Sequence, residues 1–293
     1  MFIESLEEQL AKWFPFKIKD KENLDLLRER QKDRRLGVLI CANHGATTDA
    51  IRITLLLNPL KREGVVGGIN FVIAKDHINF LRDPVYTVLA RLGEGLAGVE
   101  TVPVVQAYLS RDPALGEERR QQIEEETVIT GLALLRKAEE IAQNGCLVIL
   151  PEGHRSQIEG QLQPAERGLR NLVGRFPIIL PVGIKYPEKS SRGFGFGEEA
   201  ELIIGQPLTR EEIQLRAGKL GQEYGVPPQS LIHHTVMLAI CDLLPESVWG
   251  VYHPLDKKTL TRVLKNEIVL RRSPDGRVLP MDKRGEIYPK KNR

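Results

Sequence analysis

The amino-acid sequence predicts an α/β fold, with a largely parallel central sheet flanked by helices, an N-terminal amphipathic helix, and a C-terminal helical and basic extension. Two observations lead to this fold class. Apolar runs of five to eight residues, the length of buried strands, alternate with segments of helical period. The chain of 293 residues is also 41% hydrophobic and 28% charged, which is typical of a folded protein with an apolar core.

Residues 1–35 are predicted to form an N-terminal helical segment that opens with an amphipathic helix over residues 2–14. Its apolar residues share one arc of a helical wheel: Phe2, Ile3, Leu6, Leu10, Trp13 and Phe14. This face suits either a membrane interface or the protein's own core. The glutamates of the helix oppose an anionic lipid surface and therefore favour the core.

Four apolar runs are predicted to be strands of a core that spans residues 36–210. The runs are LGVLICA (36–42), INFVIA (69–74), CLVIL (146–150) and PIILPVGI (177–184). Segments of helical period over 47–57 and 127–145 lie between them, and the second ends at Asn144-Gly145, a typical helix stop. Residues 211–293 follow as a C-terminal helical extension with a basic tail.

The first strand runs directly into Asn43-His44-Gly45-Ala46-Thr47-Thr48-Asp49, where Thr47 or Thr48 is placed to cap the next helix. Ligands of open α/β sheets bind beyond the carboxyl ends of the strands. In a tight turn, a spacing of five residues brings the Asp49 carboxylate against one imidazole nitrogen of His44 and leaves the other for a substrate. His44 is therefore a candidate general base. The alternative is a hydrogen-bonded histidine beside a helix-start acid.

The third strand ends in Pro151-Glu152-Gly153-His154-Arg155-Ser156, so a second polar loop reaches the same crevice. Gly153 lets the backbone approach a ligand, and the planar fork of Arg155 suits a phosphate or carboxylate. The alternative is a surface turn with an exposed arginine.

Residues 43–49 and 151–156 resemble the NHxxxxD and PEGTRS blocks of the glycerolipid acyltransferases, the family of lysophosphatidic acid and glycerol-3-phosphate acyltransferases. Two looser blocks agree in order, Arg167-Gly168 and ILPVGI (179–184), and AICDLLPESVWGVY (239–252) is similar to a C-terminal stretch found in several members. The resemblance covers residues 36 to 252 and makes the 36–210 core an acyltransferase core.

The resemblance implies transfer of a fatty acyl group from an acyl-CoA or acyl-carrier-protein thioester to the hydroxyl of 1-acylglycerol 3-phosphate in phospholipid biosynthesis. It implies that His44 removes the acceptor proton and that Asp49 holds the imidazolium. The acceptor-binding side would comprise Glu152, Gly153, Arg155, Ser156 and Arg167. The alternatives are glycerol 3-phosphate or another lysolipid as acceptor, a thioester hydrolase, and a non-catalytic homologue that binds lipid or acyl carrier.

Two departures from the family pattern bear on the acceptor. His154 stands where the family has threonine, and with Glu159 it forms a rival His-carboxylate pair at the same spacing. Gln106 stands where the family has an arginine that helps to bind phosphate. Arg111, Arg91 or Lys75 are the candidates to replace that arginine, and the sequence does not choose among them.

The remaining features concern cofactors, partners and location. Cys41, Cys146 and Cys241 lie far apart, which predicts no zinc site and no disulfide, and no metal or other cofactor is expected beyond the thioester co-substrate. Residues 256–293 carry 12 Lys and Arg against 5 Asp and Glu. Such a tail attracts anionic lipid or an acidic carrier protein, or is simply solvated. No membrane span and no nucleic-acid partner are predicted. The expected location is cytoplasmic, peripheral on the inner face of the membrane.

Overall fold

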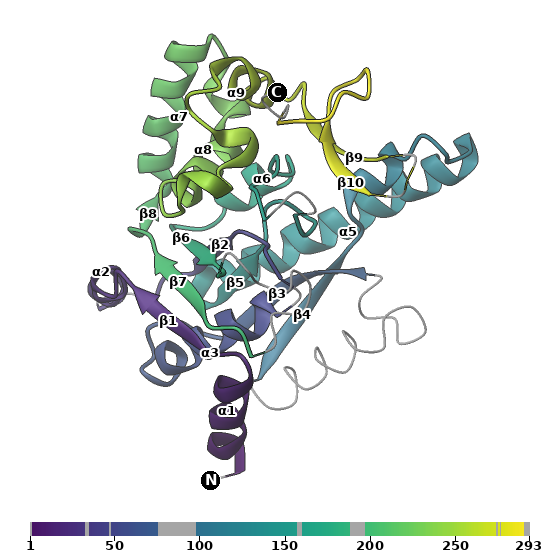
Figure 1. Cartoon of the computed structure of the whole chain (residues 1–293). Helices are drawn as coiled ribbons and strands as arrows, with labels where there is room; N and C mark the ends of the chain where they lie inside the picture. The colour runs from purple at the N-terminus through teal and green to yellow at the C-terminus, as the bar shows by residue number, and fades with distance from the viewer. Residues whose placement is uncertain are drawn as a thin grey trace.

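The computed structural model describes residues 2–32, 35–46, 48–75, 98–156, 160–187, 197–273, 275 and 277–289. It confirms the α/β fold class. The central sheet has eight strands in the order β1-β7-β6-β2-β5-β3-β4, with β8 paired to β6 (Figure 1). Their bounds are β1 Phe16–Lys19, β2 Val38–Ala42, β3 Ile69–Ala74, β4 Val99–Val104, β5 Cys146–Ile149, β6 Ile178–Lys185, β7 Ala200–Ile204 and β8 Leu208–Thr209.

The middle of the sheet is parallel, as predicted. Neighbours from β6 through β2, β5 and β3 to β4 all pair in parallel, whereas β7 and β8 run antiparallel to β6. The four predicted apolar runs became β2, β3, β5 and β6. The edge strands β1 and β4 escaped prediction because each buries only part of its surface and therefore lacks a continuous apolar run.

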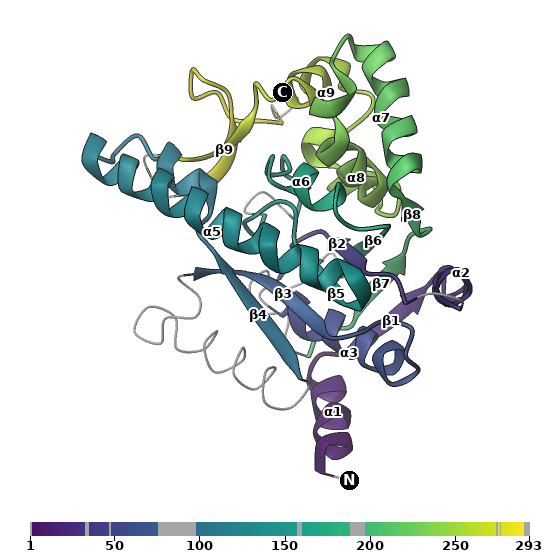
Figure 2. The same ribbon diagram turned by 180° about the vertical axis from the view of Figure 1, so that it is seen from behind.

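Helices cover both faces of the sheet (Figures 1 and 2). The strand β2 shows why: Val38, Ile40 and Ala42 pack with α2 and α3, while Leu39 and Cys41 face the opposite layer of α5, α6 and α8. Helix bounds are α1 Phe2–Trp13, α2 Glu22–Gln31, α3 Asp49–Arg62, α5 Glu117–Asn144, α6 Leu169–Val173, α7 Arg210–Tyr224, α8 Ile232–Cys241 and α9 Lys257–Leu264.

The helix α5 is longer than its apolar period indicated. It begins at Glu117, ten residues before the predicted start, because its first turns are polar and largely solvent-exposed. It ends at Asn144, as predicted. At about 1.5 Å per residue its 28 residues extend about 42 Å, and its outer end lies near β9 (Val269–Arg272) and β10 (Val278–Met281), a separate hairpin (Figure 2).

The N-terminal helix α1 contacts α3 through polar groups. Glu7 accepts hydrogen bonds from Asn58 Nδ2 at 2.7 Å and from Arg62 Nη1 at 2.8 Å. The helix extends away from the sheet with the N-terminus at its tip (Figure 1), and Trp13 at its end is 46% exposed. The core therefore holds α1 mainly at its C-terminal end, where Phe14 is buried.

Residues 211–293, the predicted C-terminal extension, include most of α7 and pack on the α5 side of the sheet. The helix α8 of this extension is almost entirely buried and joins the same apolar cluster as α5 and α6. Residues 290–293 of the basic tail lie outside the described residues.

Candidate functional site

The loop after β2 is anchored to the neighbouring strand β6 by Asn43. Its Nδ2 donates to the carbonyl oxygen of Ile184 at 2.9 Å, and its Oδ1 accepts from the backbone N–H of Ile184 at 2.6 Å. Asn43 is buried, so these two bonds satisfy its amide and fix the start of the loop. The next residue, His44, is thereby held at the carboxyl end of the sheet.

The predicted contact between His44 and Asp49 is present. His44 Nδ1 lies 3.0 Å from Asp49 Oδ2, and the same oxygen accepts backbone N–H groups from Gly45 at 2.8 Å and Ala46 at 2.9 Å. Because a carboxylate only accepts, the imidazole carries its proton on Nδ1 and leaves Nε2 for a ligand. Asp49 is fully buried, whereas the His44 side chain is 12% exposed.

Of the two threonines expected to cap α3, the structure describes only Thr48, which does not cap the helix with its side chain. Thr48 occupies the N-cap position without a capping hydrogen bond from its side chain, and Thr47 lies outside the described residues. The Thr48 hydroxyl instead accepts a hydrogen bond from Arg52 Nη1 at 2.6 Å. Asp49, the first residue of α3, accepts its hydrogen bonds from backbone N–H groups of the loop before the helix.

Glu152 belongs to the loop that follows β5, and its side chain is buried. It is 1% exposed, and its two carboxylate oxygens accept backbone N–H groups from His44 and Gln163, each at 2.8 Å. Burial raises the pKa of Glu152 to about 8, against the opposing effect of these two hydrogen bonds, and the charge of Asp49 raises it further. The geometry makes Glu152 a support of the His44 backbone, and its expected contact with the acceptor stays a prediction.

The rest of the predicted binding loop lies beside His44. Gly153 has a φ of 68°, and a Cβ there would lie 3.1 Å from Glu166, so glycine suits both the turn and the space. The backbone N–H of Ser156 donates to the carbonyl oxygen of His44 at 3.2 Å. Arg155 is half-buried and is not among the residues that line the adjoining cavity, so its contact with a phosphate also stays a prediction.

The rival pair of His154 and Glu159 stays a prediction, because Glu159 lies outside the described residues. His154 Nδ1 lies 2.7 Å from the carbonyl oxygen of Arg155, and the ring packs edge-on against Tyr108 at 5.2 Å between centroids.

Gln106, at the position where the pattern of the resembled family has an arginine, holds the same loop from the end of β4. Its Nε2 donates to the carbonyl oxygen of Gly153, and its Oε1 accepts from the Tyr108 hydroxyl at 2.8 Å. Of the three candidates to supply the missing charge, Arg111 lines the cavity, Lys75 pairs with Glu126 at 3.2 Å, and Arg91 lies outside the described residues.

Two arginines at the cavity are held from the C-terminal extension. Arg111 makes two hydrogen bonds of 3.1 Å to the carboxylate of Glu166 and a third, of 3.2 Å, to the carbonyl oxygen of Leu270 in β9. Arg167 donates through Nε to Asn266 Oδ1 at 3.3 Å and through Nη2 to the Asn266 carbonyl at 3.5 Å. The sequence predicted Arg167 as a binding residue but not its partner Asn266, because Asn266 belongs to no motif.

A cavity of about 550 Å³ adjoins His44 at the carboxyl ends of β3, β4 and β5, under α5 and α6. Its walls are mostly aliphatic, with Val72, Val104, Leu132, Leu135, Ile149 and Leu172 among them. The polar residues of its wall include His44, Gln106, Arg111, Glu166 and Arg167. Val128 and Leu132 of α5 are 60% and 53% exposed, so the cavity reaches the surface along that helix.

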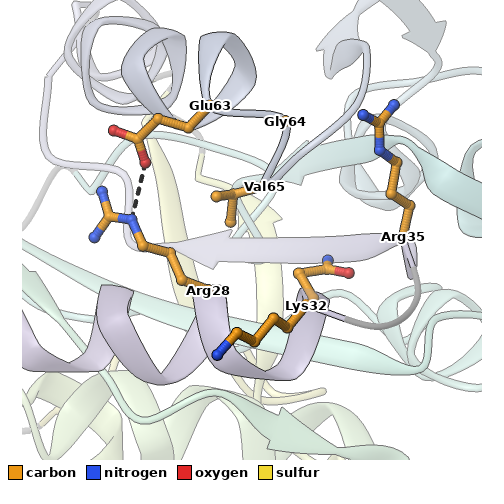
Figure 3. Close-up of a pocket in the computed structure, with 7 residues that line it drawn as sticks. Arg28, Lys32, Arg35, Glu63, Gly64 and Val65 are labelled. Carbon is orange, nitrogen blue, oxygen red and sulfur yellow. Dashed lines mark hydrogen bonds and ion pairs between the residues drawn. The ribbon is translucent and has the colours of Figure 1, made fainter.

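A smaller basic hollow of about 350 Å³ lies at the opposite edge of the sheet, where β2 begins and α3 ends (Figure 3). Arg28 is already paired there with Glu63 at 2.9 Å, and the side chains of Lys32 and Arg35 extend in different directions. These cations do not converge on one point. The hollow is also on the wrong edge to share a ligand with His44.

Neither a membrane-spanning helix nor a metal centre is found in the described part of the chain. None of its helices is both long and apolar enough to cross a bilayer, and no three of its His, Cys, Asp or Glu side chains gather closely enough to hold a metal ion. The three cysteines are free and buried, and burial raises their pKa values, as expected for Cys41 in a core strand.

No protein-family model and no curated protein sequence matches the chain. Among solved structures, the chain is similar to the crystal structure of the 1-acyl-sn-glycerophosphate (LPA) acyltransferase, PlsC, from Thermotoga maritima. The two proteins are 17% identical, the match covers 76% of this chain and 80% of the other, and the TM-score is 0.35. Similarity at this level carries no chemistry from one protein to the other, so the reaction has to be argued from the site itself.

Proposed function

We propose that the protein is an O-acyltransferase that moves a fatty acyl group from the thioester of acyl-CoA or acyl-carrier protein to the hydroxyl of 1-acylglycerol 3-phosphate. One observation carries the proposal. An imidazole oriented by a buried carboxylate lines a largely aliphatic cavity whose wall also contains two arginines. This combination suits a reaction that brings together a hydroxyl, an acyl chain and a phosphate.

The His44–Asp49 pair supplies the proton transfers. His44 Nε2 takes the proton of the acceptor hydroxyl as its oxygen attacks the thioester carbonyl carbon, and Asp49 stabilises the imidazolium through Nδ1. Collapse of the tetrahedral intermediate breaks the carbon–sulfur bond. The leaving thiolate then takes the proton from His44, which returns the imidazole to its neutral form. His44 and Asp49 carry every proton transfer in this scheme, so we expect a chelator to leave the rate unchanged.

The aliphatic cavity is the proposed site of an acyl chain. Its volume of about 550 Å³ lies within the range of pockets that enclose small ligands. Each methylene that leaves water for such a wall contributes about 0.8 kcal/mol. Since the cavity adjoins His44 and opens along α5, a chain can lie in it with its carbonyl at the imidazole and its far end toward the exposed Val128 and Leu132.

Arg167 and Arg111 are the proposed contacts of the acceptor phosphate. Both line the cavity with His44, and charged hydrogen bonds of this kind contribute about 1.5–3 kcal/mol each. The Glu166 carboxylate orients Arg111, and Asn266 orients Arg167. Arg155, half-buried two residues after Gly153, is a third candidate.

Peripheral attachment to a membrane is proposed because a lysolipid acceptor is itself amphiphilic. The helix α1 extends from the body of the protein with the N-terminus at its tip (Figure 1), and Trp13, at the end of the helix next to the body, is 46% exposed. Flotation with anionic liposomes at low salt, with a Trp13→Ala variant beside the wild type, tests this attachment. A wild type that stays with the soluble fraction would favour glycerol 3-phosphate as the acceptor.

The function is tested by combining acyl-CoA and acyl-carrier-protein donors with 1-acylglycerol 3-phosphate, glycerol 3-phosphate and no acceptor, and by identifying the product by mass. We expect transfer to the lysolipid, and a loss of about 100- to 10,000-fold for His44→Ala, as removal of a general base predicts. Release of free fatty acid without acceptor would indicate a hydrolase instead.

A matched control for this variant is His253→Ala. His253 also pairs with a carboxylate, since its Nε2 lies 3.1 Å from Glu246 Oε1, yet it does not line the cavity. We expect this variant to keep wild-type activity. Wild-type protein that transfers acyl groups to none of the acceptors would refute the proposed function.

A further inference from the structure

The second oxygen of Asp49 has a partner that the sequence motifs do not contain. The hydroxyl of Tyr186, which follows β6, donates to Asp49 Oδ1, while His44, Gly45 and Ala46 occupy Oδ2. The Tyr186 ring packs directly on this turn, since a Cβ at Gly45 would lie 3.0 Å from its Cε2. Both oxygens of the buried carboxylate are therefore held.

Behind Tyr186 lies Arg52, a fully buried arginine. Its Nη1 donates to the Tyr186 hydroxyl at 3.1 Å and to Thr48 Oγ1 at 2.6 Å, and its Nη2 donates to the Glu198 carbonyl at 2.8 Å. The guanidinium carbon also lies 5.2 Å from the centroid of the Tyr186 ring and 5.8 Å from that of Phe14. Four separate segments of the chain thus fix one buried cation two hydrogen bonds from Asp49.

We propose that Tyr186 and Arg52 are positioning residues of the acyl transfer, which hold Asp49 in the single orientation and charge state that align His44 with the acceptor hydroxyl. The inference rests on the proposed function and adds to it two residues outside the family motifs.

The physical reason lies in the isolation of Asp49 from water. A buried carboxylate is costly unless it is hydrogen-bonded and its charge is compensated. The torsion that turns a carboxylate is broad, so an unheld Oδ1 would let Asp49 swing and carry the imidazole with it. Burial raises the pKa of Tyr186 well above its ordinary value, so the phenol remains a donor to Asp49. Arg52 supplies the compensating positive charge.

Tyr186→Phe removes one hydroxyl and leaves the ring in place. We expect kcat to fall about 10- to 100-fold, as loss of a hydrogen bond to a charged group predicts, with the KM values of donor and acceptor unchanged within about twofold. The rates are normalised to the folded fraction of each variant, because loss of folded protein also lowers the apparent kcat without changing KM. A change confined to KM would overturn the proposal.

The molecule contains a matched control at its C-terminal end. The Tyr288 hydroxyl accepts from Arg262 and donates to Glu286 at 2.9 Å, and Arg262 lies 4.9 Å from the ring centroid, so it copies the arginine–tyrosine–carboxylate arrangement away from the cavity. Tyr288→Phe is expected to keep wild-type kcat. An equal loss in both variants would show that any buried phenol of this kind matters, and would overturn the specific role of Tyr186.

A double-mutant cycle tests whether Tyr186 acts through Asp49. In the Asp49→Asn background, Tyr186→Phe should cause no further loss of kcat beyond about twofold, because the group it positions is gone. Full additivity of the two losses would overturn the proposal. Arg52→Lys, which keeps the buried charge but cannot bond Tyr186, Thr48 and the Glu198 carbonyl together, should reproduce part of the Tyr186→Phe loss. Wild-type kcat in a folded Arg52→Lys protein would remove Arg52 from the proposal.

A readout without substrate separates this inference from the proposed function. The two ring ¹⁵N signals of His44 report which nitrogen carries the proton. We expect well separated signals with Nδ1 protonated in the wild type, and a narrower separation in Tyr186→Phe as the ring loses its fixed partner. Unchanged signals would refute the positioning role even if the wild type proves to have no transferase activity.

Discussion

Glu152→Gln replaces one oxygen of the carboxyl group, which can accept a hydrogen bond even when the group is protonated, by an amide nitrogen that only donates, at a position where both oxygens accept backbone N–H groups. One of the N–H groups of His44 and Gln163 would then face another donor inside the protein. A buried donor left without an acceptor costs about 1–3 kcal/mol. We therefore expect the variant to lose about that much free energy of unfolding at pH 5.

The loss should also depend on pH. Burial raises the pKa of folded Glu152 to about 8, whereas an unfolded glutamate titrates near its ordinary value of 4.5. Between these values the folded protein keeps a proton that the unfolded chain has released, so the free energy of unfolding falls as pH rises. The stabilisation is complete below pH 4.5 and gone above about pH 8, with a slope of at most about 1.4 kcal/mol per pH unit. The amide of the Glu152→Gln variant cannot titrate, so the wild type should lose its advantage over the variant as pH rises. At this slope the difference between the two proteins changes by up to about 4 kcal/mol from pH 5 to pH 8, so it should close and reverse in sign before pH 8.

Urea denaturation of both proteins from pH 5 to 8 measures this difference in free energy of unfolding. Histidines that titrate in the same range contribute equally to both proteins, so their contribution drops out of the difference. Glu201→Gln is a suitable control, because hydrogen bonds from Lys19 and Lys185 lower the pKa of Glu201. The ionised Glu201 therefore contributes its full stabilisation between pH 5 and 8 and loses it only at lower pH. The difference in free energy of unfolding between the wild type and Glu201→Gln should not change over this range. A difference between the wild type and Glu152→Gln that does not change between pH 5 and 8 would refute the reasoning.

Two further variants probe the cavity. Asn266→Gly keeps the left-handed backbone of that residue (φ 54°) but removes the side-chain oxygen that accepts hydrogen bonds from Arg167 and His233. We expect the acceptor KM to rise about 3- to 10-fold and kcat to stay nearly unchanged in steady-state kinetics. A fall in kcat without a rise in KM would contradict the role of Asn266 in holding Arg167. Gly131 lines the cavity, and a Cβ there would meet no atom within 4 Å. Gly131→Leu should therefore raise the free energy of unfolding by up to about 1 kcal/mol and shift the donor preference toward shorter chains, whereas an unchanged chain-length profile would argue against the cavity as the acyl site.

The sequence predicted the parts of the molecule that local chemistry specifies. Strands β2, β3, β5 and β6 are buried on both faces, so each is a continuous apolar run that can be recognised without a partner. Edge strands such as β4, and the polar first half of α5, carry no such signal. Their structure depends on neighbours that the local pattern does not name.

The contacts of the site also divide into those that local sequence predicts and those that depend on the tertiary structure. His44 and Asp49 lie five residues apart in one turn, so their contact follows from spacing and turn geometry alone. Arg52 and Tyr186 are 134 residues apart, Arg111 and Glu166 are 55 apart, and Arg167 and Asn266 are 99 apart. Such pairs meet only after the sheet has ordered its strands and the C-terminal extension has packed on α5 and α6. The sequence by itself therefore determined the fold class and the contact between His44 and Asp49. The tertiary structure decided which buried residues hold that contact and which residues line the cavity beside it, because hydrogen bonds over these separations are chosen by packing.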